Sequence, residues 1–591
     1  MNTDVKLTID GIPVSAPPDY TVLEAARLIG IEIPSLCYLK GINEIGLCRI
    51  CVVEAEGVRN LVASCVYPVA EGLVVRTNTE RIRRIRKMTL ELIMSNHRTE
   101  CLICTRNPQC ELQRLANDLK VDRTRYEGVV EEPQPQIDDS AVHLIRDNSK
   151  CVLCRRCVAV CEKKQSVAVI GVLDRGFDTH VSCAFDRNLD ETPCVYCGQC
   201  ITACPTGALT DNDSTETIWE ALADPGKHVV AGIAPAVRVA LGECFGLPVG
   251  TNVEGKMVTA LRRLGFDGVF DICTAADITV LEEGAEFIDR FKRGGVLPLI
   301  TSCSPGWVKF CQQFYPEFIP NLSTCKSPQQ MFGAIIKSYY ANLKGIDNKD
   351  VFVVSIMPCT AKKHEIRRDG RQTYDLYDVD ATVTTRGLAH MISRAGLMFN
   401  ELDESAFDPP FGVSTGAGVI FGATGGVMEA ALRTVCEVMT GEPLPNVELE
   451  SIRGMDGVKE AEYMIDGKAV RVAACSGLSN ARKLLDSIKA GESKYDFIEI
   501  MCCPGGCIGG GGQPVPPSVV RNFSNLLENR AKALYALDKD KSVRKSHENP
   551  VVKKIYDDFL GKPGGHLSHK LLHTSYKAGT KYSAMLESAD D

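Results

Sequence analysis

Two stretches of this 591-residue sequence share one cysteine spacing: CVLCRRCVAVC at residues 151–161 and CVYCGQCITACP at residues 194–205. Both follow C-x2-C-x2-C-x3-C, and the second ends in proline. This duplicated run is typical of two [4Fe–4S] clusters in which the fourth cysteine of each run ligates the other cluster. It predicts a two-cluster, ferredoxin-like domain over residues 141–212. The expected ligand sets are Cys151, Cys154, Cys157 and Cys204 for one cluster, and Cys194, Cys197, Cys200 and Cys161 for the other.

The first 78 residues predict a small β-rich domain with a further metal site. Residues 5–9 alternate apolar and polar side chains before the turn Asp10-Gly11, which predicts a β-hairpin. Residues 21–29 have helical apolar spacing. Four thiols with the spacing C-x10-C-x2-C-x13-C favour a [2Fe–2S] cluster over its main rival, zinc. These thiols are Cys37, Cys48, Cys51 and Cys65.

A third metal site is predicted within residues 79–124. An amphipathic helix runs from residue 82 to about residue 96, and the pattern H-x3-C-x2-C-x5-C comes directly after it. Four such ligands fit either zinc or a [4Fe–4S] cluster with one histidine ligand, and the neighbouring cluster motifs favour the second. These ligands are His97, Cys101, Cys104 and Cys110. The basic residues of the helix are expected to form a solvated face: Arg81, Arg83, Arg84, Arg86 and Lys87. Residues 131–135, EEPQP, indicate a linker.

Beyond residue 226 the pattern changes to that of an α/β domain. Short apolar runs alternate with helical patterns, which predicts strands separated by helices over residues 226–518. The runs lie at residues 229–233, 268–272, 296–300, 351–356 and 497–500. Residues 519–578 are mostly helical in pattern and thin in apolar residues, so we expect them to pack against this domain.

Three cysteine motifs each follow one of these predicted strands. They are TSCSPGW at residues 301–307, MPCTAK at residues 357–362 and EIMCCPGGC at residues 499–507. In an open α/β sheet, loops at the carboxyl ends of the strands converge on the ligand crevice. The three loops therefore predict one shared metal site.

Composition and charge narrow the class of protein. Lys and Arg number 67 and Asp and Glu 75, which gives a net charge of −8 and argues against a nucleic-acid or anionic-lipid surface. The sequence shows neither a signal-peptide pattern at its start nor a run of about 18 apolar residues. We expect a cytoplasmic protein with no nucleic-acid or membrane partner, whose 27 cysteines bind metal rather than form disulfides.

The three loop motifs resemble those of the [FeFe]-hydrogenases: TSC-C-P-x-W, MPC-x-x-K-x-x-E and E-x-M-x-C-x-x-G-C-x-x-GGGQP. The second is present as Met357-Pro358-Cys359 with Lys362 and Glu365, and the third is nearly intact over residues 499–514. The resemblance covers nearly the whole chain, including small-subunit-like segments at residues 546–550 and 571–574. It implies an oxidoreductase that converts H2 reversibly to protons and electrons at an H-cluster. That cofactor is a [4Fe–4S] cube joined through a cysteine sulfur to a two-iron unit with CO, cyanide and a dithiolate.

With this resemblance, the expected fold class is multidomain α+β and α/β. A β-grasp [2Fe–2S] domain at residues 1–78 precedes a Cys-His cluster domain at residues 79–124 and the two-cluster ferredoxin-like domain at residues 141–212. The large α/β H-cluster domain occupies residues 226–518 and carries a helical, small-subunit-like extension at residues 519–578. The implied cofactors are the H-cluster, three further [4Fe–4S] clusters and one [2Fe–2S] cluster, which together form an electron wire.

The resemblance also implies roles for single residues. Cys359, Cys503 and Cys507 match the cube ligands, and Cys507 matches the one that bridges to the two-iron unit. Cys303 matches the cysteine that exchanges protons with the cofactor. The remaining matches are Glu283, Ser323 and Glu286 in the proton relay, Ala234, Pro235 and Lys362 near cyanide, Gln329 near CO, and Met357, Phe421 and Met501 in the apolar walls.

The first motif departs from the family pattern at Ser304, where the family has a cube cysteine. Either Ser304 binds iron as an alkoxide, or the loop shifts and Cys303 becomes the ligand, because a neutral hydroxyl is a poor iron ligand. The spacing from Cys303 to Cys359 keeps the family register, so we favour a relay role for Cys303.

Partners are also implied. With this serine, the chain resembles the family members that are NAD(P)-linked, multimeric enzymes. No Gly-x-Gly-x-x-Gly follows a predicted strand, so nucleotide reduction requires a partner subunit. The hypothesis is the catalytic subunit of an NAD(P)-linked hydrogenase of the electron-bifurcating type, served by flavin- and NAD(P)-binding and iron–sulfur subunits or by ferredoxin. The alternatives are a monomeric ferredoxin-dependent hydrogenase, a non-catalytic hydrogen sensor, and an iron–sulfur electron-transfer or assembly protein.

Overall fold

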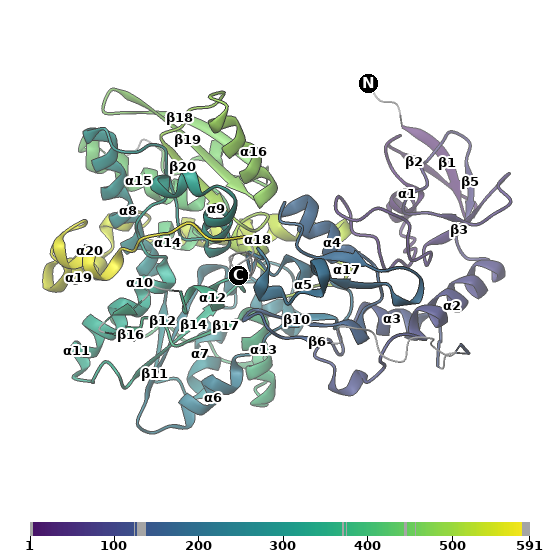
Figure 1. Cartoon of the computed structure of the whole chain (residues 1–591), viewed down its shortest axis with the longest axis horizontal. Helices are drawn as coiled ribbons and strands as arrows, with labels where there is room; N and C mark the ends of the chain where they lie inside the picture. Colours follow the sequence, from purple (N-terminus) through teal and green to yellow (C-terminus); the bar gives the residue numbers. More distant parts are fainter. Residues whose placement is uncertain are drawn as a thin grey trace, which may run out of the picture.

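The computed structural model describes residues 4–122, 125–126, 137–368, 372–373, 375–442, 446–455 and 457–581. The predicted linker at residues 131–135 lies outside these residues. Figure 1 shows the first 120 residues at one end of the molecule and the sheets of the large domain at the other, with residues 137–212 between them. Among the described residues, no helix combines the length and the apolar character needed to cross a membrane.

The N-terminal unit is a five-stranded sheet with the order β2-β1-β5-β3-β4. β1 and β2 form the predicted hairpin, and Asp10 and Gly11 at its turn have φ values of 49° and 81°. Thr21 caps α1 through reciprocal bonds with Glu24, which fixes the start of that helix. The element bounds are β1 Val5–Ile9, β2 Ile12–Ala16, α1 Val22–Leu28, β3 Val52–Ala55, β4 Val62–Ala63 and β5 Val74–Arg76.

The second unit consists mainly of helices and lies beside this sheet. Its elements are α2 Glu80–Met94, a 3-10 turn at Cys101–Ile103 and α3 Glu111–Asp118. The predicted solvated face of α2 is wrong at Arg86, which is 6% exposed and donates to the Val52 carbonyl oxygen at 2.8 Å. Arg86 lies on the side of α2 that faces β3, and a run of basic residues does not reveal which member faces inward.

The third unit, residues 137–212, repeats one local structure. In each half a cysteine loop leads into a short helix, and the residue before that helix is left-handed: Arg155 (φ 62°) before α4 and Gly198 (φ 65°) before α5. The elements are β6 Ile137–Asp138, β7 Leu144–Asp147, α4 Arg156–Ala159, β8 Gly171–Leu173, β9 His180–Ser182, α5 Gln199–Ala203 and β10 Leu209–Asp211. The predicted sequence duplication therefore corresponds to two equivalent turns.

The large domain contains two four-stranded sheets. The first has the order β12-β11-β14-β17 and is parallel throughout; the second has the order β13-β20-β19-β18, and only β18 runs antiparallel to its neighbour. The strands are β11 His228–Ile233, β12 Gly268–Asp271, β13 Leu299–Ile300, β14 Val351–Met357, β17 Ala381–Thr384, β18 Val458–Ile465, β19 Lys468–Ser476 and β20 Phe497–Met501. Each of the five predicted apolar runs contains a strand, although the run at residues 296–300 is extended only at Leu299–Ile300.

Helix α8, Cys273–Arg293, is buried along most of its first twelve residues and contacts α10, α14 and α15. Its buried face includes the carboxyl groups of Asp277, Glu282 and Glu283. The large-domain helices are α6 Thr215–Ala223, α7 Glu254–Leu264, α9 Pro305–Phe314, α10 Pro328–Ile335, α11 Ala341–Lys344, α12 Lys362–Glu365, α13 Thr385–Arg394, α14 Gly416–Ile420, α15 Gly426–Thr440 and α16 Leu478–Lys489.

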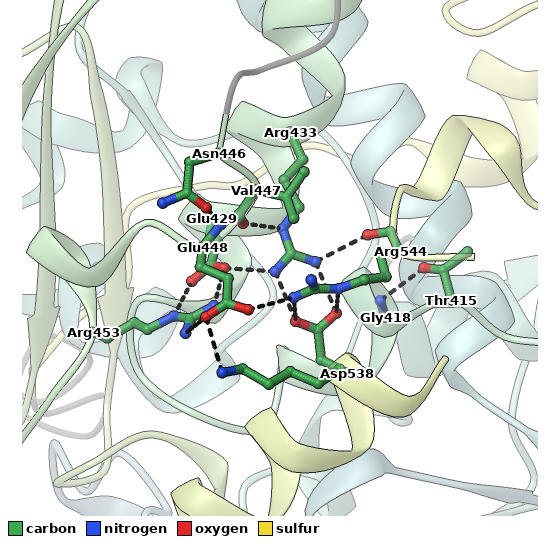
Figure 2. A network of polar contacts seen from close by, with 11 residues as sticks. Thr415, Gly418, Glu429, Arg433, Asn446, Val447, Glu448, Arg453, Asp538 and Arg544 are labelled. Carbon is green, nitrogen blue, oxygen red and sulfur yellow. Dashed lines mark hydrogen bonds and ion pairs between the residues drawn. The ribbon is translucent and has the colours of Figure 1, made fainter. Parts of the chain in front are cut away.

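The C-terminal segment packs against the large domain as predicted. Its helices are α17 Ser518–Phe523, α18 Leu526–Asp540, α19 Pro550–Ile555 and α20 His566–Leu572. Figure 2 shows the network of polar contacts that connects α15 with α18. Arg433 lies between Asp538 at 2.8 Å and Glu429 at 2.6 Å, and all three side chains are fully buried. Arg544 also pairs with Asp538, and Arg453 also pairs with Glu429.

Replacing Arg433 by Met is expected to lower the free energy of unfolding of the large domain by about 3–5 kcal/mol, because it leaves two buried carboxylates without their shared cation. Chemical denaturation of the intact chain measures this. The control is Arg471→Met, since Arg471 and Glu462 are both more than half exposed and such a pair contributes less than about 1 kcal/mol. Equal destabilisation by both variants would contradict the assignment.

Candidate active site

The three cysteine motifs lie on loops from two different sheets that meet at one place. Residues 301–307 follow β13, residues 358–362 follow β14 and residues 502–507 follow β20. β14 belongs to the first sheet and the other two strands to the second, and each loop leaves the carboxyl end of its strand. The loops do converge, but between two sheets rather than within one, which the sequence pattern did not indicate.

These loops line a cavity of about 820 Å³. Most of the residues predicted for the site of the large domain are part of its lining, namely Ala234, Pro235, Cys303, Ser304, Gln329, Met357, Cys359, Lys362, Phe421, Met501, Cys503 and Cys507. The methionine and phenylalanine side chains among them are at most 6% exposed. Glu283, Ser323 and Glu286 are not part of this lining.

Cys359, Cys503 and Cys507 are close enough to influence one another. Burial and the neighbouring Cys503 raise the pKa of the Cys507 thiol to about 12, and burial with both neighbours raises the pKa of Cys359. Thiols with raised pKa values hold their protons until a metal displaces them. A hydrogen bond with Cys502 instead lowers the pKa of the Cys503 thiol. Together, the three thiols on one cavity wall form a donor set suited to a thiolate-bound cluster.

Two features of the third loop keep its backbone close to the cavity. Glu499 accepts hydrogen bonds from the backbone N–H groups of Gly425 (2.6 Å) and Met428 (2.8 Å), so it caps α15 at the base of the loop. Gly506 has φ 90°, and a Cβ there would lie 2.7 Å from the Thr424 nitrogen. The motif glutamate therefore anchors the loop, and the glycine permits the close approach.

A buried polar cluster orients the cavity's lysine and glutamine. Lys362 Nζ donates to Glu365 Oε2 at 2.8 Å and to the Cys303 carbonyl oxygen at 3.1 Å. Gln329 Nε2 donates to the same Glu365 oxygen at 3.0 Å, and Ser327 Oγ does so at 2.8 Å. Glu365 is fully buried, and it holds both Lys362 and Gln329 in place.

A series of polar groups leads away from Cys303 along α8. Desolvation and the nearby Glu283 carboxyl raise the pKa of the Cys303 thiol. Burial raises the pKa of Glu283 to about 8, although a hydrogen bond with Ser323 opposes the shift. Ser323 Oγ donates to Glu286 Oε2 at 3.0 Å, and Glu286 pairs with Arg290 at 2.5 Å. The structure thus brings Glu283, Ser323 and Glu286 into one series beside Cys303.

Ser304 and Cys303 face different groups. Ser304 Oγ accepts a hydrogen bond from the Cys502 N–H at 3.2 Å, whereas Cys303 packs against Phe421 and Met501. The Cys502 thiol interacts with the thiols of both Cys503 and Cys197, so it lies between the cavity and the unit of residues 137–212. Cys502 had no predicted role, although it is adjacent to the predicted ligand Cys503.

The unit of residues 137–212 holds eight of its cysteines in two groups of four. Four thiols line one pocket, those of Cys151, Cys154, Cys157 and Cys204. The other four influence one another electrostatically: Cys161, Cys194, Cys197 and Cys200. The fourth cysteine of each run therefore lies with the first three of the other run. Cys197 also lines the large cavity, which brings the second group next to the site.

The two remaining groups of predicted metal ligands lie within residues 37–65 and 97–110. Cys37, Cys48, Cys51 and Cys65 all influence one another. A hydrogen bond from Cys37 lowers the pKa of Cys48 to about 6. In the other group, Nδ1 of His97 is buried without a hydrogen-bond partner, and Cys104 and Cys110 are close enough to interact. A buried ring nitrogen without a hydrogen-bond partner fits a metal ligand.

Comparison with known proteins decides the family. The large domain matches the family model for the "Iron only hydrogenase large subunit, C-terminal domain" over residues 227–511. The chain is 48% identical to the NADP-reducing hydrogenase subunit HndD of Solidesulfovibrio fructosivorans, over 96% of this chain and 98% of that one. The chain belongs to the [FeFe]-hydrogenases.

Further matches cover the rest of this [FeFe]-hydrogenase. Iron hydrogenase 1 of Clostridium pasteurianum is 40% identical over 97% of this chain and 99% of its own. A solved structure of HydA1 from Chlamydomonas reinhardtii is 43% identical, with a TM-score of 0.56, over 62% of this chain and 99% of that one. The other matches are a 2Fe-2S binding domain at residues 2–80, an NADH-ubiquinone oxidoreductase-G iron–sulfur region at 86–125, a 4Fe-4S dicluster domain at 150–208 and an iron hydrogenase small subunit at 524–579.

The hydrogenase is therefore an oxidoreductase in which [2Fe–2S] and [4Fe–4S] domains precede an H-cluster domain. Three polar residues near the predicted site, Glu365, Thr324 and His573, were not among the predicted site residues. Glu365 was noted as part of the second motif but was given no role. Thr324 belongs to no motif, and His573 was part only of the small-subunit-like segment at residues 571–574. The two residues are 249 positions apart, so the sequence did not indicate that they meet.

Proposed function

We propose that this hydrogenase is the H2-converting subunit of a multimeric, NADP-linked enzyme and that its H-cluster occupies the cavity between the two sheets. The observation that carries the proposal is the convergence of Cys359, Cys503 and Cys507 from separate loops on one cavity. When bound, the H-cluster supplies the iron and the bridging amine at which H2 is split. The test is hydrogen turnover together with infrared bands of CO and cyanide in protein supplied with the two-iron cofactor.

The residues of the cavity fit this cofactor. Cys359, Cys503 and Cys507 would hold the cube, and Cys507 would bridge to the two-iron unit. Lys362, oriented by Glu365, presents an ammonium group suited to an anionic cyanide. Gln329 would donate near CO, Ala234 and Pro235 would contact cyanide, and the apolar walls of Met357, Phe421 and Met501 exclude water.

Protons would move along the groups beside α8. With a pKa of about 8, the Glu283 carboxyl is mostly protonated at neutral pH and can donate to or accept from the Cys303 side. Ser323 relays between Glu283 and Glu286, since a hydroxyl both donates and accepts. Glu286 forms the outer end of this relay beside Arg290. We infer that Cys303 is the residue that exchanges protons with the cofactor.

Electrons would leave through the accessory clusters. Thr360 Oγ1 donates to the Tyr196 carbonyl oxygen at 2.8 Å and ties the Cys359 loop to the Cys197 loop. Beyond the ferredoxin-like unit the route divides: Arg106 donates to the Cys204 carbonyl oxygen at 2.9 Å, and Asn43 bridges the Cys37 and Cys154 carbonyl oxygens. We assign three further [4Fe–4S] clusters and one [2Fe–2S] cluster to these sites, on β-grasp, Cys-His and ferredoxin-like domains.

The acceptor is inferred from the relatives. The near full-length match to a subunit named as NADP-reducing supports NADP as the final acceptor. A partner subunit that binds flavin and NADP would take the electrons from either branch, and two branches also suit a bifurcating enzyme that uses ferredoxin. A monomeric ferredoxin-dependent enzyme is the second candidate, and co-purification of flavoprotein subunits from the native host separates the two.

For the fourth cube position we propose the Ser304 oxygen. Ser304 Oγ accepts a hydrogen bond from the Cys502 N–H, and this bond stabilises an anionic oxygen. Ser304→Ala should therefore alter the electron paramagnetic resonance signal of the cube in protein lacking the two-iron unit, and Ser304→Cys should give an all-thiolate signal. Cys502→Ala is the matched control and should leave the signal in place. If Cys502→Ala removes the signal and Ser304→Ala does not, the ligand is Cys502.

A further inference from the structure

The C-terminal segment reaches the outer end of the proposed proton relay. Residues 324–326 and 572–574 pair through their backbones: Lys326 N donates to the Leu572 oxygen and Thr574 N to the Thr324 oxygen, both at 2.7 Å. This pairing holds the imidazole of His573 beside the Thr324 hydroxyl. No part of the relay inferred above uses either side chain.

One oxygen of Glu286 joins the two sides. Glu286 Oε2 accepts from Ser323 Oγ at 3.0 Å on the inner side and from Thr324 Oγ1 at 3.2 Å on the outer side. Glu286 Oε1 faces Arg290. The Glu286 carboxylate therefore connects the two hydroxyl groups, and the Thr324 hydroxyl is the next group in the series of hydrogen bonds.

The hydrogen bonds continue from the hydroxyl to the imidazole. Thr324 Oγ1 lies 2.7 Å from His573 Nδ1, and His573 Nε2 lies 3.1 Å from Glu282 Oε2. Glu282 is fully buried and accepts from Tyr556 OH at 2.5 Å and from Gly564 N at 2.7 Å. Glu282 can therefore fix the ring with its proton on Nε2, which leaves Nδ1 free to accept a proton.

From this geometry we propose that His573 is a proton-loading site, connected to Glu286 through the Thr324 hydroxyl. The proposal rests on the proposed function. In one transfer, a protonated Glu286 gives its proton to Thr324 Oγ1 while the Thr324 proton moves to His573 Nδ1. Glu286 is left as a carboxylate paired with Arg290, and the imidazolium is paired with Glu282; the reverse transfer returns the proton.

The surroundings of His573 suit this role. The groups that face it are Glu282, Glu286 with its partner Arg290, the Cys325 thiol, the Tyr556 hydroxyl and the exposed His569. His569 stacks on His573 with ring centroids 4.6 Å apart. The His573 side chain is 5% exposed, so the imidazole lies close to the solvent. The carboxylates of Glu282 and Glu286 both lie beside the ring.

Thr324→Val tests the proposal because valine has nearly the shape of threonine but cannot pass a proton. Turnover of the loaded, full-length enzyme should fall about tenfold or more, and the H2O/D2O rate ratio should rise, with unchanged infrared bands. Thr324→Ser should restore the rate. His573→Gln should lower turnover to a similar degree, and adding Thr324→Val should lower it no further.

His569→Gln is the control, since His569 stacks on the ring but takes part in no hydrogen bond of the series. Wild-type turnover from Thr324→Val, or effects of Thr324→Val and His573→Gln that multiply, would overturn the proposal. Failure of the proposed function is a different result, because the wild-type protein would then show neither bands nor turnover.

Discussion

Glu283→Gln should lower hydrogen turnover by about 10² to 10⁴ fold, the range that a positioned acid–base group contributes. Glutamine keeps the size and hydrogen-bonding capacity of the side chain but cannot gain or lose a proton. Glu283 is 3% exposed and its raised pKa of about 8 places its titration near neutral pH. Because Glu283 does not line the cavity, the infrared bands of CO and cyanide should not change.

Hydrogen uptake and evolution, measured on protein loaded with the two-iron cofactor, check this expectation. Glu317→Gln is the control, since Glu317 is exposed and lies outside the relay. Turnover of Glu283→Gln within twofold of the wild type would exclude Glu283 from the relay. Loss of the infrared bands would instead show that Glu283 supports the structure of the site.

Cys507→Ala is expected to abolish turnover and to remove the bands of the two-iron unit. In the proposed site this thiol is shared by the cube and the two-iron unit, so its removal disconnects them, and no other side chain of that short 3-10 turn (Cys507–Gly509) offers a sulfur. The accessory clusters should remain, because their cysteines lie on separate units. Infrared spectroscopy and iron determination after cofactor loading measure both effects.

Cys436→Ala is the matched control for this variant. Cys436 is also buried, on α15, and belongs to no motif, so its removal should leave bands and turnover near wild-type values. Retention of both by Cys507→Ala would show that Cys507 is not the bridge.

The grouping of cysteines in the first 212 residues was largely predictable, because the cysteines proposed as cluster ligands lie close together in sequence. The spacing of Cys151 to Cys161 and of Cys194 to Cys204 fixed the crossed grouping, and a short motif needs no knowledge of tertiary structure. The hairpin at Asp10-Gly11 and the five apolar runs were predicted for the same reason, since turn residues and strand periodicity are local.

The rest depends on contacts between distant segments. The second sheet gains the hairpin of β18 and β19, which the apolar runs did not reveal because β18 is partly exposed. Glu365 gains its role by meeting Gln329, 36 positions away. His573 meets Thr324 only after the C-terminal segment has docked. Local patterns carry no information on such convergence.

The most direct test of the whole account is to supply the purified apo-protein with the synthetic two-iron cofactor and to record infrared spectra and hydrogen turnover on the same sample. We expect CO and cyanide bands together with uptake and evolution of H2, and loss of both in Cys507→Ala. Bands without turnover would point to hydrogen sensing. Absence of bands in cofactor-treated wild-type protein with intact accessory clusters would contradict the claim that three loops from two sheets build one H-cluster site.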